Sequence, residues 1–160
     1  MASTRAARAR GFTLIEIMVV MVIIGITLGL VSINAIPSPR QNLQAEAQRI
    51  ALLLQLARDE AIVRNRLVAF EADSEQYRFL VRNETRWDPV TADDLLRERP
   101  FKRAPLTLTL DPLPPAGVTV PLRIVFGREP VDKPFALTMA DASNNAVTVR
   151  ADGIGHFVVE

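Results

Sequence analysis

The sequence predicts an α+β fold in which a long N-terminal helix packs on an antiparallel β-sheet head. An apolar run near the N-terminus is followed by a second segment whose apolar residues recur with helical spacing. After Arg66 the apolar residues alternate with polar ones, which is typical of half-buried strands. These observations predict helix over residues 12–66, with an interruption near its middle, and a β-rich head over residues 67–160.

Composition limits the size and the chemistry of the chain. Its 160 residues leave room for one small domain beyond the first 35, but not for two. Removing Arg5, Arg8 and Arg10 from the 19 basic residues leaves 16 against 18 acidic ones, with no basic stripe of the kind that nucleic-acid binders show. The chain has no cysteine, which excludes disulfides, thiol catalysis and thiolate metal sites.

The apolar run FTLIEIMVVMVIIGITLGLVSI, residues 12–33, carries a single charge, Glu16. At about 1.5 Å per residue, a helix of this length crosses a hydrocarbon core of about 30 Å. The arginines upstream, with no acid before Glu16, predict a cytoplasmic N-terminus and place the rest of the chain outside. We therefore expect a transmembrane helix over residues 12–36.

Two simpler interpretations of this run leave features unexplained. A cleaved secretory signal has a shorter apolar region, about 7–15 residues, and ends at a small-x-small site. The best such site here, Ile33-Asn34-Ala35, is poor. A plain membrane anchor explains the length but not Glu16, because a carboxylate within a spanning helix costs about 2.5–3.5 kcal/mol.

The residues Gly11-Phe12-Thr13-Leu14-Ile15-Glu16 resemble the prepilin cleavage motif of type IV pilins and type II secretion pseudopilins. The resemblance implies that residues 1–11 are a leader, which a membrane prepilin peptidase removes between Gly11 and Phe12. The same enzyme would methylate the new amine of Phe12. It also implies that Glu16 serves filament assembly.

The chemistry of these residues is consistent with that resemblance. Glycine at the cleavage position presents no side chain to obstruct a protease. Cleavage gives Phe12 a cationic amine about 6 Å of helix away from the Glu16 carboxylate. Pairing of Glu16 with its own amine, or with that of a neighbouring subunit, would offset the burial of the charge, and only the second makes it an assembly register. Alternatively, Glu16 extends to the lipid headgroups.

A second helical segment follows Pro37-Ser38-Pro39, where we expect a kink or a short break. Apolar residues then recur at spacings of 4, 3, 4, 3 and 4, and we call them the apolar stripe: Leu43, Ala47, Ile50, Leu54, Ala57 and Ala61. This pattern predicts an amphipathic helix within residues 37–66 that lies against a sheet of its own domain. A two-helix coiled coil is the alternative.

The C-terminal part predicts short strands joined by polar turns. Strands are expected at residues 67–70, 77–81, 106–110, 118–126, 135–139, 146–150 and 156–159. The last three should form a meander. The stretch 84–105 looks irregular, with a short helix expected over Ala92–Arg99.

The segments 45–64, 134–139 and 147–153 resemble the H-type minor pseudopilins of type II secretion systems. The resemblance implies a single-pass protein of the inner membrane with a periplasmic head, supporting export of folded proteins across the outer membrane. The implied partners are the prepilin peptidase, the major pseudopilin, the other minor pseudopilins and inner-membrane lipid. The lack of C-terminal cysteines favours secretion over type IV pili. A minor pilin (assembly, adhesion or DNA uptake) and a membrane-anchored periplasmic module that does not polymerise stay open as alternatives.

No residue pattern indicates catalysis, so we expect no enzyme activity, cofactor, metal or small-molecule substrate. His156 is the only histidine and falls in a terminal strand, which favours a surface or packing role. Asp132, Asp141 and Asp152 fall in predicted turns, where aspartate accepts backbone hydrogen bonds. Trp87 is expected to be buried under the irregular stretch.

Overall fold

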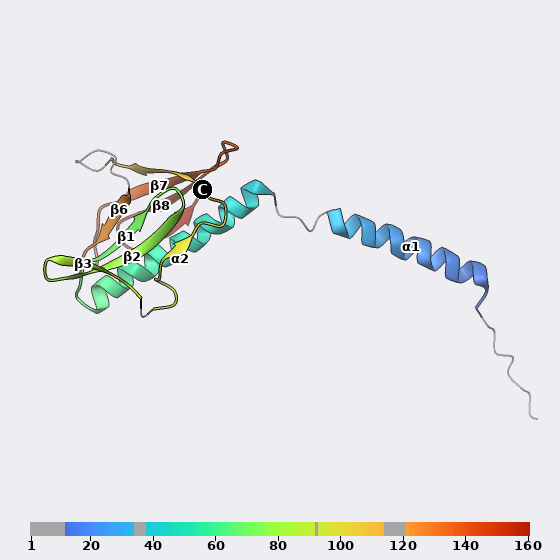
Figure 1. Cartoon of the computed structure of the whole chain (residues 1–160), viewed down its shortest axis with the longest axis horizontal. Coiled ribbons are helices and arrows are strands. Elements are labelled where there is room, and N and C mark those ends of the chain that lie inside the picture. Colours follow the sequence, from blue (N-terminus) through green and yellow to red (C-terminus); the bar gives the residue numbers. More distant parts are fainter. Residues whose placement is uncertain (1–11, 34–37, 92, 114–120) are drawn as a thin grey trace, which may run out of the picture. The chain divides into compact units, whose positions relative to one another are not determined.

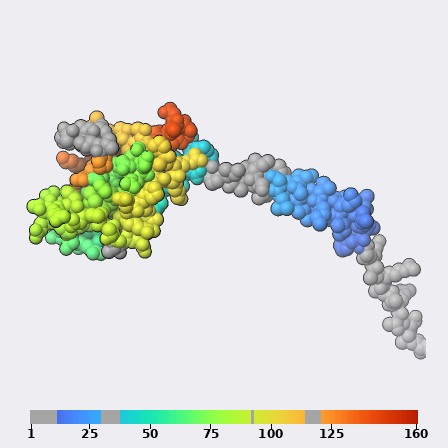
Figure 2. Space-filling view, viewed as in Figure 1, coloured from blue at the N-terminus to red at the C-terminus, as the bar shows by residue number. Residues whose placement is uncertain are grey.

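The computed structural model describes residues 12–33, 38–91, 93–113 and 121–160 (Figures 1 and 2). The chain divides into two compact units, Met1–Pro37 and Ser38–Glu160. On the face shown in Figure 2, the green and yellow segments that follow the second helix cover most of that helix. The predicted leader (residues 1–11) and the end of the predicted span (residues 34–36) lie outside the described residues.

Helix α1, Leu14–Ile33, forms over the apolar run. Its described side chains are exposed around the whole helix. The Thr27 hydroxyl donates to the carbonyl of Ile23 at 2.9 Å, so this polar group is satisfied within the helix. No helix among the described residues combines the length and apolar character needed to cross a membrane. The helical conformation is thus confirmed, and the crossing stays a prediction.

Helix α2, Pro39–Val63, begins with a capping box. The Gln41 N–H donates to the Ser38 hydroxyl at 3.2 Å, and the Ser38 N–H donates to the Gln41 side chain at 2.9 Å. Pro39 occupies the first helical position, where its missing N–H leaves no bond unmade. The helix start at Pro39 is consistent with the interruption expected there. Every residue of the apolar stripe is buried, which confirms the predicted amphipathic helix.

The first sheet has the strand order β3-β2-β1-β6, with β4 beside β2. All pairs are antiparallel, and Phe70 of the central β1 lies opposite Phe79 of β2 and Ile124 of β6. The bounds are β1 Val68–Ala72, β2 Gln76–Asn83, β3 Arg86–Pro89, β4 Arg99–Pro100 and β6 Leu122–Phe126.

The second sheet has the order β5-β7-β8-β9 and is also antiparallel. Its three C-terminal strands form the predicted meander. Leu137 of β7 lies opposite Leu110 of β5 and Val149 of β8. The bounds are β5 Thr107–Asp111, β7 Phe135–Ala140, β8 Ala146–Ala151 and β9 Phe157–Val159.

The core lies between α2 and both sheets, because α2 contacts β1 and β6 of the first and β7, β8 and β9 of the second (Figure 1). Phe70, Tyr77 and Phe79 are fully buried, with the Phe70 and Phe79 ring centroids 5.3 Å apart. The predicted α+β fold is confirmed, with one refinement. The head has two sheets, since β6 pairs with β1 and does not join the C-terminal meander.

The short helix expected over Ala92–Arg99 is wrong. Ala92 lies outside the described residues, and residues 93–98 form a turn that leads into β4. The Asp93 carboxylate accepts the N–H of Leu95 at 2.7 Å, so it closes a turn and caps no helix. The expected irregular stretch also contains β3, whose four residues are held by pairing with β2.

Candidate processing and assembly site

Only one side of the predicted cleavage point is described by the structure. Gly11 lies outside the described residues. Phe12 is the first described residue, and its side chain is 78% exposed. The structure therefore does not test cleavage between Gly11 and Phe12, or methylation of Phe12.

Glu16 lies in the first turn of α1. Its N–H donates to the Thr13 carbonyl at 3.1 Å and lies 3.3 Å from the Thr13 hydroxyl, so Thr13 caps the helix. An acidic side chain here interacts favourably with the positive end of the helix dipole. Within the described part of the chain, the Glu16 carboxylate has no ion pair or side-chain hydrogen bond. It is therefore available to a cation from outside.

An ion cluster around the buried Glu71, which the sequence did not suggest, lies on the face of the first sheet that points away from α2. Glu71 is only 2% exposed. Its carboxylate accepts a hydrogen bond from Nε of Arg78 at 2.8 Å and another from Nε of Arg123 at 2.9 Å. Burial alone would raise the pKa of the Glu71 carboxyl, but the hydrogen bonds from Arg123 and Arg78 outweigh it and lower the pKa. The cluster thus joins β1, β2 and β6.

Trp87 lies on the same face, which corrects its predicted position under a loop. It belongs to β3 and is half-buried. The guanidinium carbons of Arg82 and Arg123 each lie 5.6 Å from the centre of its ring. This stack covers the outer face of the sheet with an aromatic ring and two cations.

A further arginine, Arg58, connects α2 with the loops at one end of the sheets. It is 8% exposed and donates to the Pro130 carbonyl. Gly155 has φ +115, and a Cβ there would lie 2.6 Å from Arg58 Nη1. A side chain at this position would require both a strained backbone and a shift of the guanidinium, so glycine is favoured here.

The turn aspartates have the roles that the sequence predicts. Asp141 accepts the N–H of Ser143 at 2.8 Å. Asp152 accepts the N–H of Ile154 at 2.8 Å and lies 2.7 Å from Nδ1 of the exposed His156. Burial opposes the change, but these bonds lower the pKa of Asp152 to about 2. Among the described residues, no three His, Cys, Asp or Glu side chains group as metal ligands.

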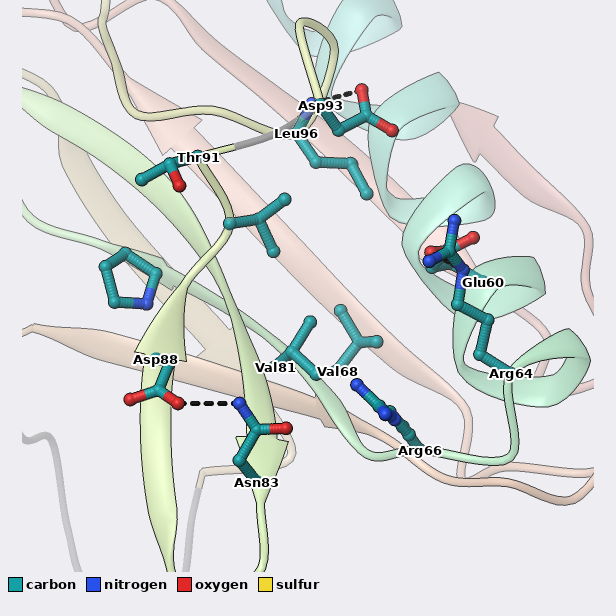
Figure 3. Close-up of a pocket in the computed structure, with 12 residues that line it drawn as sticks. Glu60, Arg64, Arg66, Val68, Val81, Asn83, Asp88, Thr91, Asp93 and Leu96 are labelled. Carbon is teal, nitrogen blue, oxygen red and sulfur yellow. Dashed lines mark hydrogen bonds and ion pairs between the residues drawn. The ribbon is translucent and has the colours of Figure 1, made fainter.

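A pocket of about 310 Å³ opens at the C-terminal end of α2 (Figure 3). Figure 3 shows Glu60 of α2 and Arg64, which follows the helix, on one side, and Asn83 of β2 and Asp88 of β3 on the other. Val68 and other apolar side chains form its floor. No sequence motif indicates this pocket.

Two family models match the chain. The model described as "Type II transport protein GspH" matches residues 46–155, and the "Prokaryotic N-terminal methylation motif" matches residues 6–32. A protein of Pseudomonas aeruginosa named "Type II secretion system protein H" is 39% identical over 109 residues, or 66% of this chain. The matched region spans 62% of the length of that relative.

Two solved structures have the same fold. The solution structure of Escherichia coli GspH matches with a TM-score of 0.52 at 24% identity, over 76% of this chain and 91% of its own. The minor pseudopilin EpsH of the Vibrio cholerae type 2 secretion system matches with a TM-score of 0.55 at 19% identity, over 71% and 92%. With the family model covering most of the head, the chain belongs to the GspH family.

Proposed function

We propose that this chain is a minor pseudopilin, a structural subunit of a type II secretion pseudopilus that supports export of folded proteins from the periplasm across the outer membrane. The observation that carries the proposal is the presence, on one chain, of an N-terminal methylation motif and a GspH head. The name of the Pseudomonas aeruginosa relative supports the same apparatus. The role is structural and not catalytic.

In this proposal the prepilin peptidase removes residues 1–11 and methylates Phe12. Residues 12–36 then anchor the subunit in inner-membrane lipid with its head in the periplasm, as the apolar run and upstream arginines predict. The major pseudopilin and the other minor pseudopilins are the filament partners.

Glu16 sets the position of the subunit along the filament. Its carboxylate has no partner within the described residues, and the N-terminal amine of a neighbouring subunit is a cation of the right charge. Burying the acid beside that amine offsets much of the cost of placing it in lipid. Because the pair forms only when two subunits have the correct axial offset, it selects one register.

Processing is tested by mass spectrometry of the mature protein purified from membranes of a host with its peptidase. We expect a polypeptide that begins at methylated Phe12, and an unprocessed chain in a strain without the peptidase. A mature protein that retains Met1, or one that begins at Ile36, contradicts the assignment.

Assembly is tested with Glu16→Ala in a strain that lacks the native gene. We expect normal membrane insertion but greatly reduced cross-linking into the pseudopilus, and substrate retained in the periplasm. Glu129→Ala, which removes an exposed acid from a loop of the head, is the matched control. Equal assembly of Glu16→Ala would refute the role of this acid. Loss of pili with intact secretion on gene deletion would instead indicate a type IV minor pilin.

A further inference from the structure

The pocket at the end of α2 has an apolar floor that continues into the core. Val68 is 1% exposed and Leu96 is 2% exposed, while Val81 and Val90 are partly buried against the same cluster. The floor is therefore rigid and already packed from below. The volume, about 310 Å³, lies at the lower limit for ligand pockets, which suits one or two side chains better than a large cofactor.

The acidic side chains at the rim are already engaged. Glu60 pairs with Arg64 at 2.5 Å. The Asn83 amide donates to the Asp88 carboxylate at 2.6 Å, and Asp93 accepts backbone N–H groups of its own turn. No acid at this rim is thus free of a partner among the described residues.

The cation Arg66 is different. It is exposed, and within the described residues its guanidinium has no ion pair or hydrogen bond. Arg66 also lines an adjoining polar hollow together with Arg82, Arg86 and the acid Glu84. The pocket and the hollow share Arg66, Asn83 and Asp88, so they form one continuous groove that is apolar at one end and rich in arginine at the other.

We infer that this groove binds an extended segment of a protein partner in which an acidic side chain lies two residues from an apolar one. Residues two apart in an extended chain point to the same side, so both side chains can enter the groove together. The apolar side chain fills the space above Val68 and Leu96, and the carboxylate pairs with Arg66. Charge complementarity favours this occupant, because three arginines line the hollow against two acids, Glu84 and Asp88, and Asp88 already accepts the Asn83 amide.

The inference concerns the head alone and does not rest on filament assembly. Its test uses the ¹⁵N-labelled full chain in lipid nanodiscs and the capped peptide acetyl-Ala-Leu-Ala-Asp-Ala-amide. We expect amide shift changes centred on Val68, Val81 and Leu96. Replacing the peptide's Asp with Asn should weaken binding about threefold to fivefold, as expected for a partly exposed ion pair. A Lys peptide should bind more weakly still.

Variants of the chain separate the two parts of the groove. Arg66→Gln should weaken binding of the Asp peptide by about the same threefold to fivefold factor. This variant should bind the Asp peptide and the Asn peptide with equal affinity. Arg128→Gln, which changes an exposed arginine in the loop after β6, is the matched control and should leave binding unchanged. Thr91→Trp should block the pocket, because Thr91 is exposed and lines it.

The inference is overturned if the Asp and Asn peptides bind equally, if the Lys peptide binds more tightly, or if the shift changes lie elsewhere on the head. An unchanged affinity of Arg66→Gln, or no binding at millimolar peptide, would also overturn it. Because Arg66 and Thr91 are exposed, these variants keep the core, and unchanged shifts elsewhere in the spectrum verify that they fold.

Discussion

Glu46 is a buried acid on α2, and its burial was not predicted from the sequence. It is 4% exposed, and neither carboxylate oxygen has a hydrogen-bond partner among the described residues. Arg49 lies 4.0 Å away, and the hydroxyl of Tyr77, also buried, has no partner either. Burial raises the pKa of the Glu46 carboxyl above 4.5, and the positive charges of Arg49 and Lys102 offset this only in part.

The raised pKa predicts that Glu46 makes the head less stable as pH rises. The unfolded chain releases this proton near pH 4.5, whereas the folded chain holds it to a higher pH. Between these two values the folded state binds more protons, so the free energy of unfolding falls as pH increases. Glu46→Gln removes the titrating carboxyl, and with it this contribution to the pH dependence of the free energy of unfolding. We expect the variant to gain stability relative to the wild type as the pH rises from 4.5 to about 8, because it has no buried carboxyl to ionise.

Urea unfolding at the two pH values, followed by Trp87 fluorescence, measures this difference. Glu129→Gln, which changes an exposed acid in a loop, is the control and should run parallel to the wild type. If the difference in the free energy of unfolding between Glu46→Gln and the wild type did not change with pH, the prediction would be contradicted.

Ion pairs between residues on neighbouring strands could not be predicted from the sequence. Glu71 and Arg123 are 52 positions apart, and nothing in either neighbourhood indicates that β1 and β6 pair. Turn aspartates were predicted correctly, because Asp141 and Asp152 bond to backbone N–H groups within four residues. Local chemistry is readable from the sequence, and partners brought together by the fold are not.

At the scale of elements, α2 illustrates how burial follows periodicity. Its apolar stripe faces both sheets, while Leu52, only two residues before the buried Leu54, is 67% exposed. Residues two apart on a helix lie about 200° apart around its axis, so they face opposite sides. Hydrophobicity alone does not separate these two leucines, whereas helical position does.

These two leucines give a matched pair of variants. Leu54→Ala should lower the free energy of unfolding by about 2–5 kcal/mol, because it leaves a cavity at a fully buried position. Leu52→Ala should change it by no more than about 0.5 kcal/mol. Chemical denaturation of both variants compares them directly. Similar losses for the two would mean that α2 is rotated from the position described here.

Strands with an alternating pattern of their own were predicted better than strands without one. The strands β7 and β8 were expected within one residue of their observed bounds, because alternation over six residues gives a clear signal. Strand β4, with two residues, has no pattern of its own and exists only through pairing with Gln76 and Tyr77 of β2. The single predicted sheet became two because β6 follows β5 in the chain but pairs with β1.

At the scale of the whole molecule, the core belongs to one unit. All the buried apolar residues that the structure describes lie between Leu43 and Ala151, within the unit Ser38–Glu160. We therefore expect a fragment that begins at Ser38 to unfold cooperatively. A fragment that begins at Gln48 lacks the capping box, Leu43 and Ala47, and should be less stable by several kcal/mol, about 2 to 5 from the lost leucine alone.

Trp87 fluorescence in urea measures both fragments. A broad, non-cooperative transition for the fragment that begins at Ser38 would show that residues before it are needed for the fold. Equal midpoints for the two fragments would show that the first turns of α2 add nothing to the core.

The groove beside α2 could not be predicted from the sequence for the same reason as the Glu71 cluster. Its lining comes from α2, the segment before β1, three strands and the loop after β3. Arg66 looked like one of many surface arginines, and its position in the groove is a property of the assembled head. The motif around Phe12 and Glu16, by contrast, lies within a few consecutive residues and was visible at once.

The packing of α2 on β8 and β9 also determines when the head can mature. A ribosome releases the chain from its N-terminus, so α2 emerges long before the last two strands that cover it. Until Ala151 and Val159 are synthesised, part of the apolar stripe has no sheet to pack against. The nascent chain then exposes the apolar side of an amphipathic helix, which makes it prone to aggregate. Premature termination near the C-terminus should therefore give a product that is cleared by proteases and does not survive as a shortened head.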